Sequence, residues 1–208
     1  MMSKKEKLLY PFYVISHPSD GFYEVRHRGK GSVPLALLFV VLFGFSFSIN
    51  RRFASFVVNS INPLSVNTRT EILAVVAAVL LFSIANWSVT CLMNGEGRFK
   101  DIVTVVGYSL LPLVLTFIPA TILSWFIASD EESIYYIIKY VAILFFVILL
   151  LIGIMTIHNY TFGKTLITLI LTFVSLLLII FVAMLIYIIM DNLKDFIASI
   201  YTELILRA

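Results

Sequence analysis

The sequence predicts an all-α membrane protein, a polytopic bundle of about five transmembrane helices. Of its 208 residues, 61% are hydrophobic and only 13% are charged, and the mean hydropathy is +1.02. A single soluble core of this size cannot bury so much apolar surface. Five apolar runs with almost no charge are each long enough, at about 1.5 Å per residue, to cross about 30 Å of hydrocarbon. No polar stretch is long enough to fold separately, so we expect one membrane domain.

The N-terminal segment, residues 1–32, is basic and lacks the early apolar run of a signal peptide. Within it, the pattern predicts a short interfacial helix over residues 19–28, capped by Ser19. We expect Phe22 and Tyr23 of this helix to face the lipid headgroups.

Residues 33–190 form the predicted membrane domain, and the apolar runs define its spans. The spans cover residues 33–49, 72–93, 102–128, 134–157 and 165–190. Two helix starts show capping-box spacing, Thr68 with Glu71 and Ser129 with Glu132. These pairs predict helices that begin at the same places as the second and fourth spans.

Polar side chains and prolines inside the spans predict contacts between helices. The polar residues are Asn86, Ser88 and Thr90 in span two and Thr104, Ser109, Thr116 and Thr121 in span three. Pro112 and Pro119 interrupt span three, so we expect this helix to be kinked and central to the bundle. A groove for a lipid or another substrate beside the kink is the alternative interpretation.

The last segment, residues 191–208, places apolar and charged residues on opposite faces at helical spacing. It predicts an amphipathic helix on the far side of the membrane. No Gly or Pro follows Gly163. This helix therefore either continues the last span directly or bends at Asp191 and Asn192.

The distribution of Lys and Arg predicts the orientation, because basic loops are retained in the cytoplasm. With the N-terminus inside, the cytoplasmic side collects Lys4, Lys5, Lys7, Arg26, Arg28, Lys30, Arg98, Lys100 and Lys164. The outer side keeps Arg51, Arg52, Arg69, Lys139, Lys194 and Arg207. We therefore expect a multi-pass protein of the cell membrane with a cytoplasmic N-terminus and an extracytoplasmic C-terminus.

The spans show few groups suited to catalysis or metal binding. Their centres contain no ionisable residue, and Lys139 is close enough to a span end to extend toward the interface. The histidines, His17, His27 and His158, lack metal-ligand spacing. Cys91 stands alone in an apolar run, where we expect it to be buried. The net charge of +3 is dispersed, so a nucleic-acid partner is not indicated.

Two short patterns resemble reactive sites. Gly163-Lys164-Thr165 copies the end of a phosphate-binding loop, but His158 stands where that loop needs its first glycine, so a plain helix start is favoured. Ser109 with His158 is the one pair able to supply a nucleophile and a base, and packing is the more common role for such a serine. We therefore expect no enzyme activity and no cofactor.

Three stretches of the chain carry a family resemblance. They are HPSDGFYEVRHRGKGS, NWSVTCLMNGEGRFKDIVTVVGYSLLPLVL and IMTIHNYTFGKTL. The most specific element runs from Gly107 to Pro112 and is close to the pattern Gly-Tyr-x-Leu-Leu-Pro. It follows a Gly-rich basic loop from Gly95 to Lys100. Over residues 17–190 the chain resembles the YIP (Ypt-interacting protein) family of five-span membrane proteins, in the compact form of its bacterial branch.

The resemblance implies five spans with a cytoplasmic N-terminus and a C-terminus on the other side. It also implies work alongside membrane transport machinery such as ABC-type permeases. Eukaryotic members bind Rab-type GTPases, but this chain lacks their long polar tail and Asp-Leu-Tyr-Gly-Pro element, so GTPase binding is not expected.

Two functions follow from these observations. The first is a non-enzymatic scaffold or accessory subunit of a membrane transport or trafficking assembly, bound to another membrane protein or to itself. The second is a transporter or channel-like component that moves a small or lipidic substrate beside the kinked third span. The candidate partner or packing surface comprises Asn86, Trp87, Gly95, Gly97, Arg98, Gly107, Tyr108, Pro112, His158, Asn159, Gly163 and Lys164.

Overall fold

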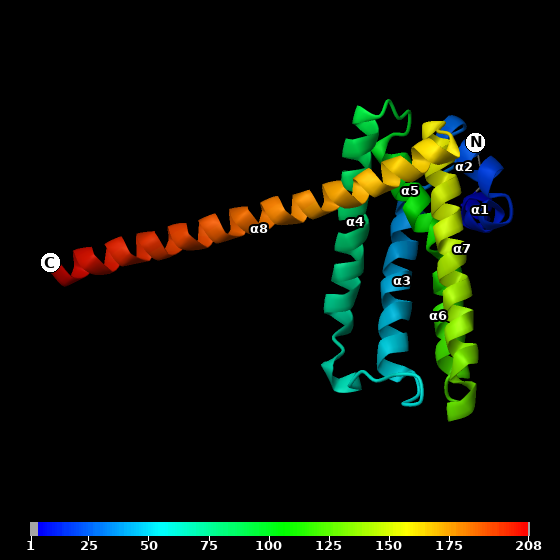
Figure 1. Ribbon diagram of the computed structural model, residues 1–208, viewed down its shortest axis with the longest axis horizontal. Coiled ribbons are helices and arrows are strands. Elements are labelled where there is room, and N and C mark those ends of the chain that lie inside the picture. The colour runs from blue at the N-terminus through cyan, green and yellow to red at the C-terminus, as the bar shows by residue number, and fades with distance from the viewer. Residues whose placement is uncertain (1–3, 208) are drawn as a thin grey trace.

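The computed structural model describes residues 4–207 and is helical apart from short loops (Figure 1). Residues 1–3 of the predicted N-terminal segment and residue 208 of the predicted C-terminal helix lie outside it. The α-helices are α1 (Lys4–Ser16), α2 (Pro18–His27), α3 (Val33–Phe53), α4 (Thr68–Leu92), α5 (Phe99–Ser109), α6 (Leu111–Leu123), α7 (Glu132–His158) and α8 (Phe162–Arg207). Two 3-10 helices, η1 (Pro63–Ser65) and η2 (Ser129–Glu131), lie in loops. The predicted all-α class is confirmed.

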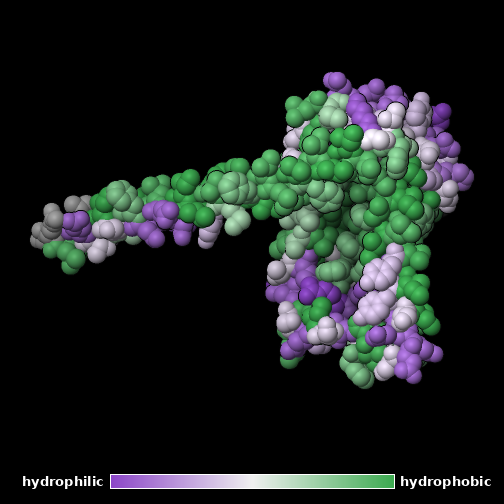
Figure 2. All heavy atoms as spheres, viewed as in Figure 1, coloured by the Kyte–Doolittle hydropathy of each residue, from purple (hydrophilic) through white to green (hydrophobic). Residues whose placement is uncertain are grey.

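Within the described chain, five segments are long and apolar enough to cross a membrane, as predicted. They are Val33–Phe53, Thr68–Leu92, Phe99–Leu123, Ser129–His158 and Phe162–Glu203. The first four run side by side (Figure 1), and hydrophilic residues gather at both ends of this bundle while its middle is apolar (Figure 2). We call the end that carries α1 and α2 the N-terminal end. The loops 54–67 and 124–131 lie at the opposite end.

Span three is divided into α5 and α6 at Leu110. Pro112 lies in the first turn of α6, and its nitrogen carries no hydrogen, so the carbonyl of Tyr108 loses its helical partner. Helix α6 continues through Pro119. In the most apolar stretch of span three 72% of residues are buried, against 28% to 44% in the other three spans of the bundle. The predicted kink and central position of this span are confirmed.

The start of α4 differs from the predicted capping box. Asn67, and not Thr68, is the N-cap, and its side-chain oxygen accepts a hydrogen bond from the backbone N–H of Arg69 at 3.1 Å. Glu71 instead pairs with Arg51 at 2.7 Å. The predicted box is wrong because an amide one residue earlier already satisfies the free N–H groups of the first turn.

The capping box predicted before α7 is also wrong. Ser129 begins the 3-10 helix η2, and α7 follows from Glu132 without a side-chain cap. The tighter 3-10 turn uses up the residues that the box would need, so Ser129 is too far from the first turn of α7 to cap it.

Helices α1 and α2 form a cap on the N-terminal end of the bundle. Phe22 of α2 is fully buried beside Gly153 of α7, and Tyr10 of α1 donates a hydrogen bond to the backbone of α2 at 2.8 Å. The N-cap of α2 is His17, and not Ser19 as predicted. Because α7 offers a glycine against which an aromatic ring can pack, Phe22 faces protein and not lipid. Helix α1 was not predicted from the sequence.

Helix α8 is one uninterrupted helix of 46 residues, about 69 Å long at 1.5 Å per residue. It does not bend at Asp191 or Asn192, so the C-terminal segment continues the last span. Helix α8 packs against α4 near its start and then extends away from the bundle at a steep angle (Figure 1). Its C-terminal end lies to the side of the bundle. Only 6% of its most apolar stretch is buried.

Candidate functional site

At the N-terminal end of the bundle, two loops that belong to the candidate surface are locked together. The backbone N–H of Gly97 donates a hydrogen bond to Nδ1 of His158 at 3.1 Å. The imidazole ring stacks on Tyr160 with the ring centroids 5.2 Å apart, and the hydroxyl of Tyr160 donates to the carbonyl of Met93 at 3.1 Å. We call this contact between the loop after α4 and the loop after α7 the loop junction.

The loop after α4 requires glycine at positions 95 and 97 because its backbone passes directly over the imidazole of His158. A Cβ at Gly95 would lie 2.5 Å from Nδ1 of His158, and one at Gly97 would lie 2.7 Å from its Cε1. His158 is itself buried. The Gly-rich loop therefore serves close packing. Burial raises the pKa of Tyr160, and Cys91 adds to this rise.

Cys91 is exposed, although its apolar run suggested a buried position. It lies in the last turn of α4, where the helix turns this side chain away from the bundle. The expectation was wrong because an apolar run in a span does not say which face meets protein and which meets lipid.

Ion pairs tie α2 to the first turn of α5. The carboxylate of Asp101, which is buried, accepts hydrogen bonds from the backbone N–H of Arg98 at 3.2 Å and from its Nε at 2.9 Å. Nη1 of Arg26 lies 3.6 Å from the same carboxylate, and Nη2 of Arg98 donates to the carbonyl of Arg26 at 3.3 Å. Arg98 was among the predicted candidates and Asp101 was not, although an acid three residues after an N-cap is a capping signal.

The candidate residues of span three lie inside the bundle. A Cβ at Gly107 would lie 2.6 Å from Ala36, so α3 and α5 touch through their backbones there. The hydroxyl of Tyr108 accepts a hydrogen bond from the backbone N–H of Ser32 at 3.0 Å. Pro112 is buried in the first turn of α6. The motif from Gly107 to Pro112 therefore positions α3 against span three.

Asn86 joins α4 to α8. Its side-chain amide donates a hydrogen bond to Oγ1 of Thr172 at 3.0 Å. Both helices carry fully buried small or polar residues with the same spacing of three and four positions. These residues are Ser83, Asn86 and Thr90 on α4 and Thr165, Thr168 and Thr172 on α8. Asn86 and Thr90 were predicted to make helix contacts, and so was Ser88, which is exposed. The threonines of α8 were not predicted despite their spacing.

The remaining candidates lie at the surface of the N-terminal end. Trp87 is 44% exposed and meets the ring of Phe99 edge-on. Asn159 ends α7 in the left-handed conformation, with φ of 54°, and a Cβ at Gly163 would have no neighbour within 4 Å. Nζ of Lys164 lies 4.1 Å above the ring of Tyr160. The structure therefore splits the candidate set into interior packing residues and a small exposed group.

A polar cluster near the opposite end of the bundle was not predicted. Oδ1 of Asn50 accepts hydrogen bonds from the hydroxyl of Tyr135 and from Nζ of Lys139, each at 2.9 Å. The amide of Asn50 donates to Oγ1 of Thr121 at 2.8 Å. Lys139 therefore turns inward, over the ring of Phe117, and does not extend toward the interface as expected. The four-residue spacing of Tyr135 and Lys139 was the available signal.

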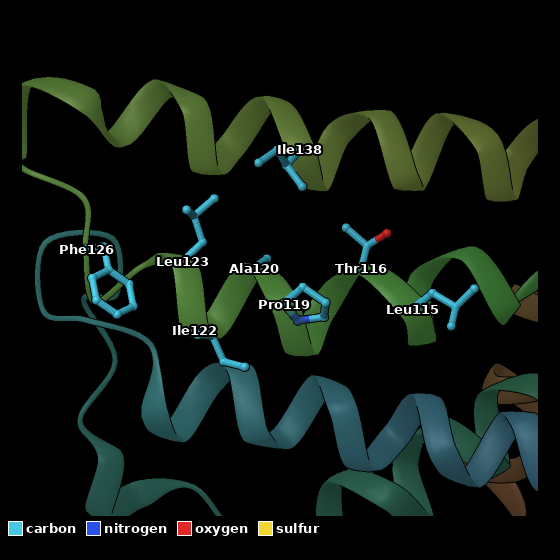
Figure 3. Close-up of a pocket in the computed structure, with 8 residues that line it drawn as sticks. All are labelled: Leu115, Thr116, Pro119, Ala120, Ile122, Leu123, Phe126 and Ile138. Carbon is cyan, nitrogen blue, oxygen red and sulfur yellow. The ribbon is translucent and has the colours of Figure 1, made fainter.

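An apolar groove of about 580 Å³ follows α6 beside α7 (Figure 3). Leu123 and Thr116 point from α6 toward α7, and Ile138 points back from α7 (Figure 3). The groove is lined by Leu115, Thr116, Pro119, Ala120, Ile122, Leu123, Phe126 and Ile138. Its single hydroxyl, on Thr116, donates to the carbonyl of Pro112 at 2.7 Å. This lining suits a hydrocarbon chain better than a polar solute.

Comparison with known proteins gives one match. Residues 12–184, most of the chain, match the family described as the Yip1 domain. No curated protein and no solved structure matches. The family match includes the loop junction and the motif from Gly107 to Pro112. This chain therefore belongs to the Yip1-domain family of multi-pass membrane proteins.

Proposed function

We propose that the protein is a non-enzymatic scaffold or accessory subunit of a membrane transport or trafficking assembly, and that α8 is the surface its partner covers. The supporting observation is the difference in burial between two spans. In the most apolar stretch of α8, 6% of residues are buried, against 72% in span three. An apolar helix that is anchored at its start and uncovered along the rest is available to pack against another membrane protein.

The charged residues near the end of α8 support this proposal. Asp191, Lys194 and Asp195 are exposed and follow directly after the apolar part of the helix. A charged side chain at the centre of a bilayer costs about 2.5 to 3.5 kcal/mol or more. Because α8 leaves the bundle at a steep angle, a partner with complementary polar groups would stabilise this end of the helix as well as its apolar part.

Two partner classes fit the proposal. An ABC-type permease is suggested by the resemblance of the chain to compact members of the family, and a second copy of this chain would also present an uncovered α8. The proposal does not include a GTPase, because the Asp-Leu-Tyr-Gly-Pro element of the GTPase-binding members does not occur in the sequence.

Photo-crosslinking in native membranes tests the proposal. A crosslinking residue at Leu178 of α8, which is 59% exposed, is expected to capture a membrane protein. The matched control carries it at Ile143 of α7, which is 40% exposed on the bundle, and is expected to capture lipid only. Purification and mass spectrometry identify the product. Recovery of free monomer alone from the Leu178 variant would contradict the proposal.

The absence of enzyme activity is part of the proposal. Nδ1 of His158 is occupied by the N–H of Gly97, and Ser109 is buried with no hydrogen-bond partner for its hydroxyl among the described residues. Among the described residues, no hydrogen bond joins the side chains of Ser109 and His158. Ser109→Ala is therefore expected to leave the function of the assembly unchanged, and loss of that function would favour a catalytic serine.

We also propose that the N-terminal end faces the cytoplasm in the cell membrane, on the basis of the excess of Lys and Arg there. In a Cys91→Ser background, Leu64→Cys places a thiol in the loop 54–67 and Glu96→Cys places one in the loop 93–98. An impermeant maleimide is expected to label the first in intact cells and the second only after permeabilisation. The reverse pattern would contradict this orientation.

The groove along α6 favours one alternative, a component that moves a lipidic substrate. Its lining of aliphatic side chains, the aromatic Phe126 and a single hydroxyl suits an acyl chain. In liposomes, Ala120→Phe would fill the groove and should abolish transfer of a fluorescent phospholipid between leaflets. No transfer by the unsubstituted protein would exclude this alternative.

A further inference from the structure

A small pocket lies at the N-terminal end, between the loop from α2 to α3 and the first turn of α5. Its volume is about 60 Å³, which holds about two water molecules or one group the size of a phosphate. Its polar wall comprises Arg98, Lys100, Asp101 and Thr104, and its loop wall includes Gly29 and Gly31. None of the functions considered above uses this pocket.

The pocket carries excess positive charge. Its one carboxylate, Asp101, is already held by Arg98 and lies 3.6 Å from Arg26. The ammonium of Lys100 makes no ion pair or hydrogen bond within residues 4–207, and Nε of Arg26 is buried without an acceptor. Two cations and one anion therefore line the pocket, and Arg26 beside Asp101 adds a third positive charge. The ammonium of Lys100 and Nε of Arg26 have donors to spare.

Neighbouring charges add to the same field. Arg28 and Lys30 flank the glycines of the loop wall, and each is paired with Glu24 at 2.7 Å. Glu96 is exposed in the loop that leads to α5. Counting these residues, five cations and three anions surround the pocket. The local field still favours an anionic ligand.

Glycines form the loop wall of the pocket, so no side chain from this wall fills the space. Gly29 has φ of 62°, a left-handed conformation that favours glycine. A Cβ at Gly31 would lie 2.8 Å from Val25 and 3.0 Å from Thr104, both of which line the pocket. A side chain there would therefore occupy the space in which a ligand would be held.

The pocket lies beside the first residues of two predicted spans. Val33 begins α3 on one side of it, and Phe99 begins α5 on the other. Phe99 and its neighbour Trp87 are 37% and 44% exposed, with ring centroids 6.0 Å apart. Exposed aromatic residues at the end of a span are typical of the headgroup region. These aromatic residues favour a position of the polar wall at the depth of lipid phosphates.

We propose that this pocket binds the phosphate group of an anionic ligand, and that the ligand is a phospholipid of the leaflet at the N-terminal end. Lys100 and Arg98 donate to the phosphate oxygens, and Asp101 holds the guanidinium of Arg98 in place for this contact. Basic pockets between transmembrane helices bind anionic headgroups in this way. The proposal does not depend on any role of α8.

The test uses the full chain, delipidated in detergent. Native mass spectrometry compares the binding of phosphatidylglycerol with that of phosphatidylcholine. We expect preference for phosphatidylglycerol, about fivefold weaker binding in Lys100→Gln, and a weaker preference at higher salt. The matched control is Lys7→Gln, on the exposed face of α1, which should bind like the unsubstituted protein. Lys100 makes no contact that the fold needs, so Lys100→Gln should keep its melting temperature.

Two further measurements distinguish a lipid from a soluble phosphate and the effect of pocket shape from the effect of charge. If inorganic phosphate at low concentration displaces phosphatidylglycerol, the site takes a soluble phosphate and the lipid assignment is overturned. Gly31→Ala leaves every charge in place and should still weaken binding, because its Cβ fills the pocket. Equal lipid binding by the unsubstituted protein and Lys100→Gln, or an equal loss in Lys7→Gln, would overturn the proposal as a whole.

Discussion

Asn86 of α4 donates a hydrogen bond to Thr172 of α8 at 3.0 Å, and both side chains are fully buried. The bond lies within two matching rows of small and polar residues, so the helices approach closely where they cross. The acceptor of the same side chain, Oδ1 of Asn86, has no partner within the described chain. This crossing anchors α8, whose remaining length extends away from the bundle.

The first prediction concerns this crossing. Asn86→Ala should lower the free energy of unfolding by about 0.6 kcal/mol, because interhelical hydrogen bonds in membranes are weak on average. The unpaired Oδ1 keeps the net loss small. Ser88→Ala, on the exposed side of the same helix, should change little. Unfolding in mixed micelles measures both, and equal losses would show that the hydrogen bond is not what stabilises the crossing.

The second prediction concerns the loop junction. Gly97→Ala should destabilise the protein by about 1 to 3 kcal/mol, because its Cβ would overlap the buried ring of His158. Gly163→Ala is the matched control, since no atom lies within 4 Å of its Cβ position and alanine favours a helix. Thermal unfolding in detergent compares the two. A loss in Gly163→Ala as large as that in Gly97→Ala would argue against the junction.

The third prediction concerns the polar cluster near the opposite end. Asn50→Leu removes the acceptor shared by Lys139 and Tyr135, and should cost about 3 kcal/mol because a partly buried cation and a buried hydroxyl lose their partner. Lys139→Met alone should cost less, since Asn50 still accepts from Tyr135. The double variant should be more stable than Asn50→Leu. If the losses of stability in Asn50→Leu and Lys139→Met add up in the double variant, the two residues do not interact.

The fourth prediction is a pH dependence in the cap formed by α1 and α2. The hydrogen bond from Lys30, helped by that from Tyr10, lowers the pKa of Glu24 below its usual 4.5 and outweighs the opposing effect of burial. A lowered carboxyl pKa stabilises the folded state above pH 4.5, and this stability is lost as the pH falls further through the folded pKa. Melting temperatures measured across this range should fall more steeply for the unsubstituted protein than for Glu24→Gln. Parallel curves would contradict the assignment.

Features that depend on nearby residues were predicted well. The five apolar segments and the break before Pro112 follow from hydropathy and from the missing N–H of proline. The N-cap of α4 was not predicted correctly, since Asn67 takes the position that Thr68 was expected to hold. Both residues suit an N-cap, and only the path of the preceding loop decides between them.

The candidate site was predicted in part. The Gly-rich loop and His158 were both selected, but nothing in either segment shows that Gly97 donates to a ring 61 residues away. Asn50 was missed for the same reason, because its partners lie on α6 and α7. The expected position of Lys139 was wrong because Asn50 of α3, Phe117 of α6 and Tyr135 of its own helix hold it inside the bundle.

The sequence by itself determined that this is a helical membrane protein with five apolar segments and a broken third span, because hydropathy and proline chemistry act over a few residues. Only the tertiary structure decided that Phe22 is buried against Gly153, that Lys139 turns inward, and that α8 crosses α4 and then leaves the bundle. The physical reason is that these features depend on which helix faces meet, and such contacts join residues that no local pattern relates.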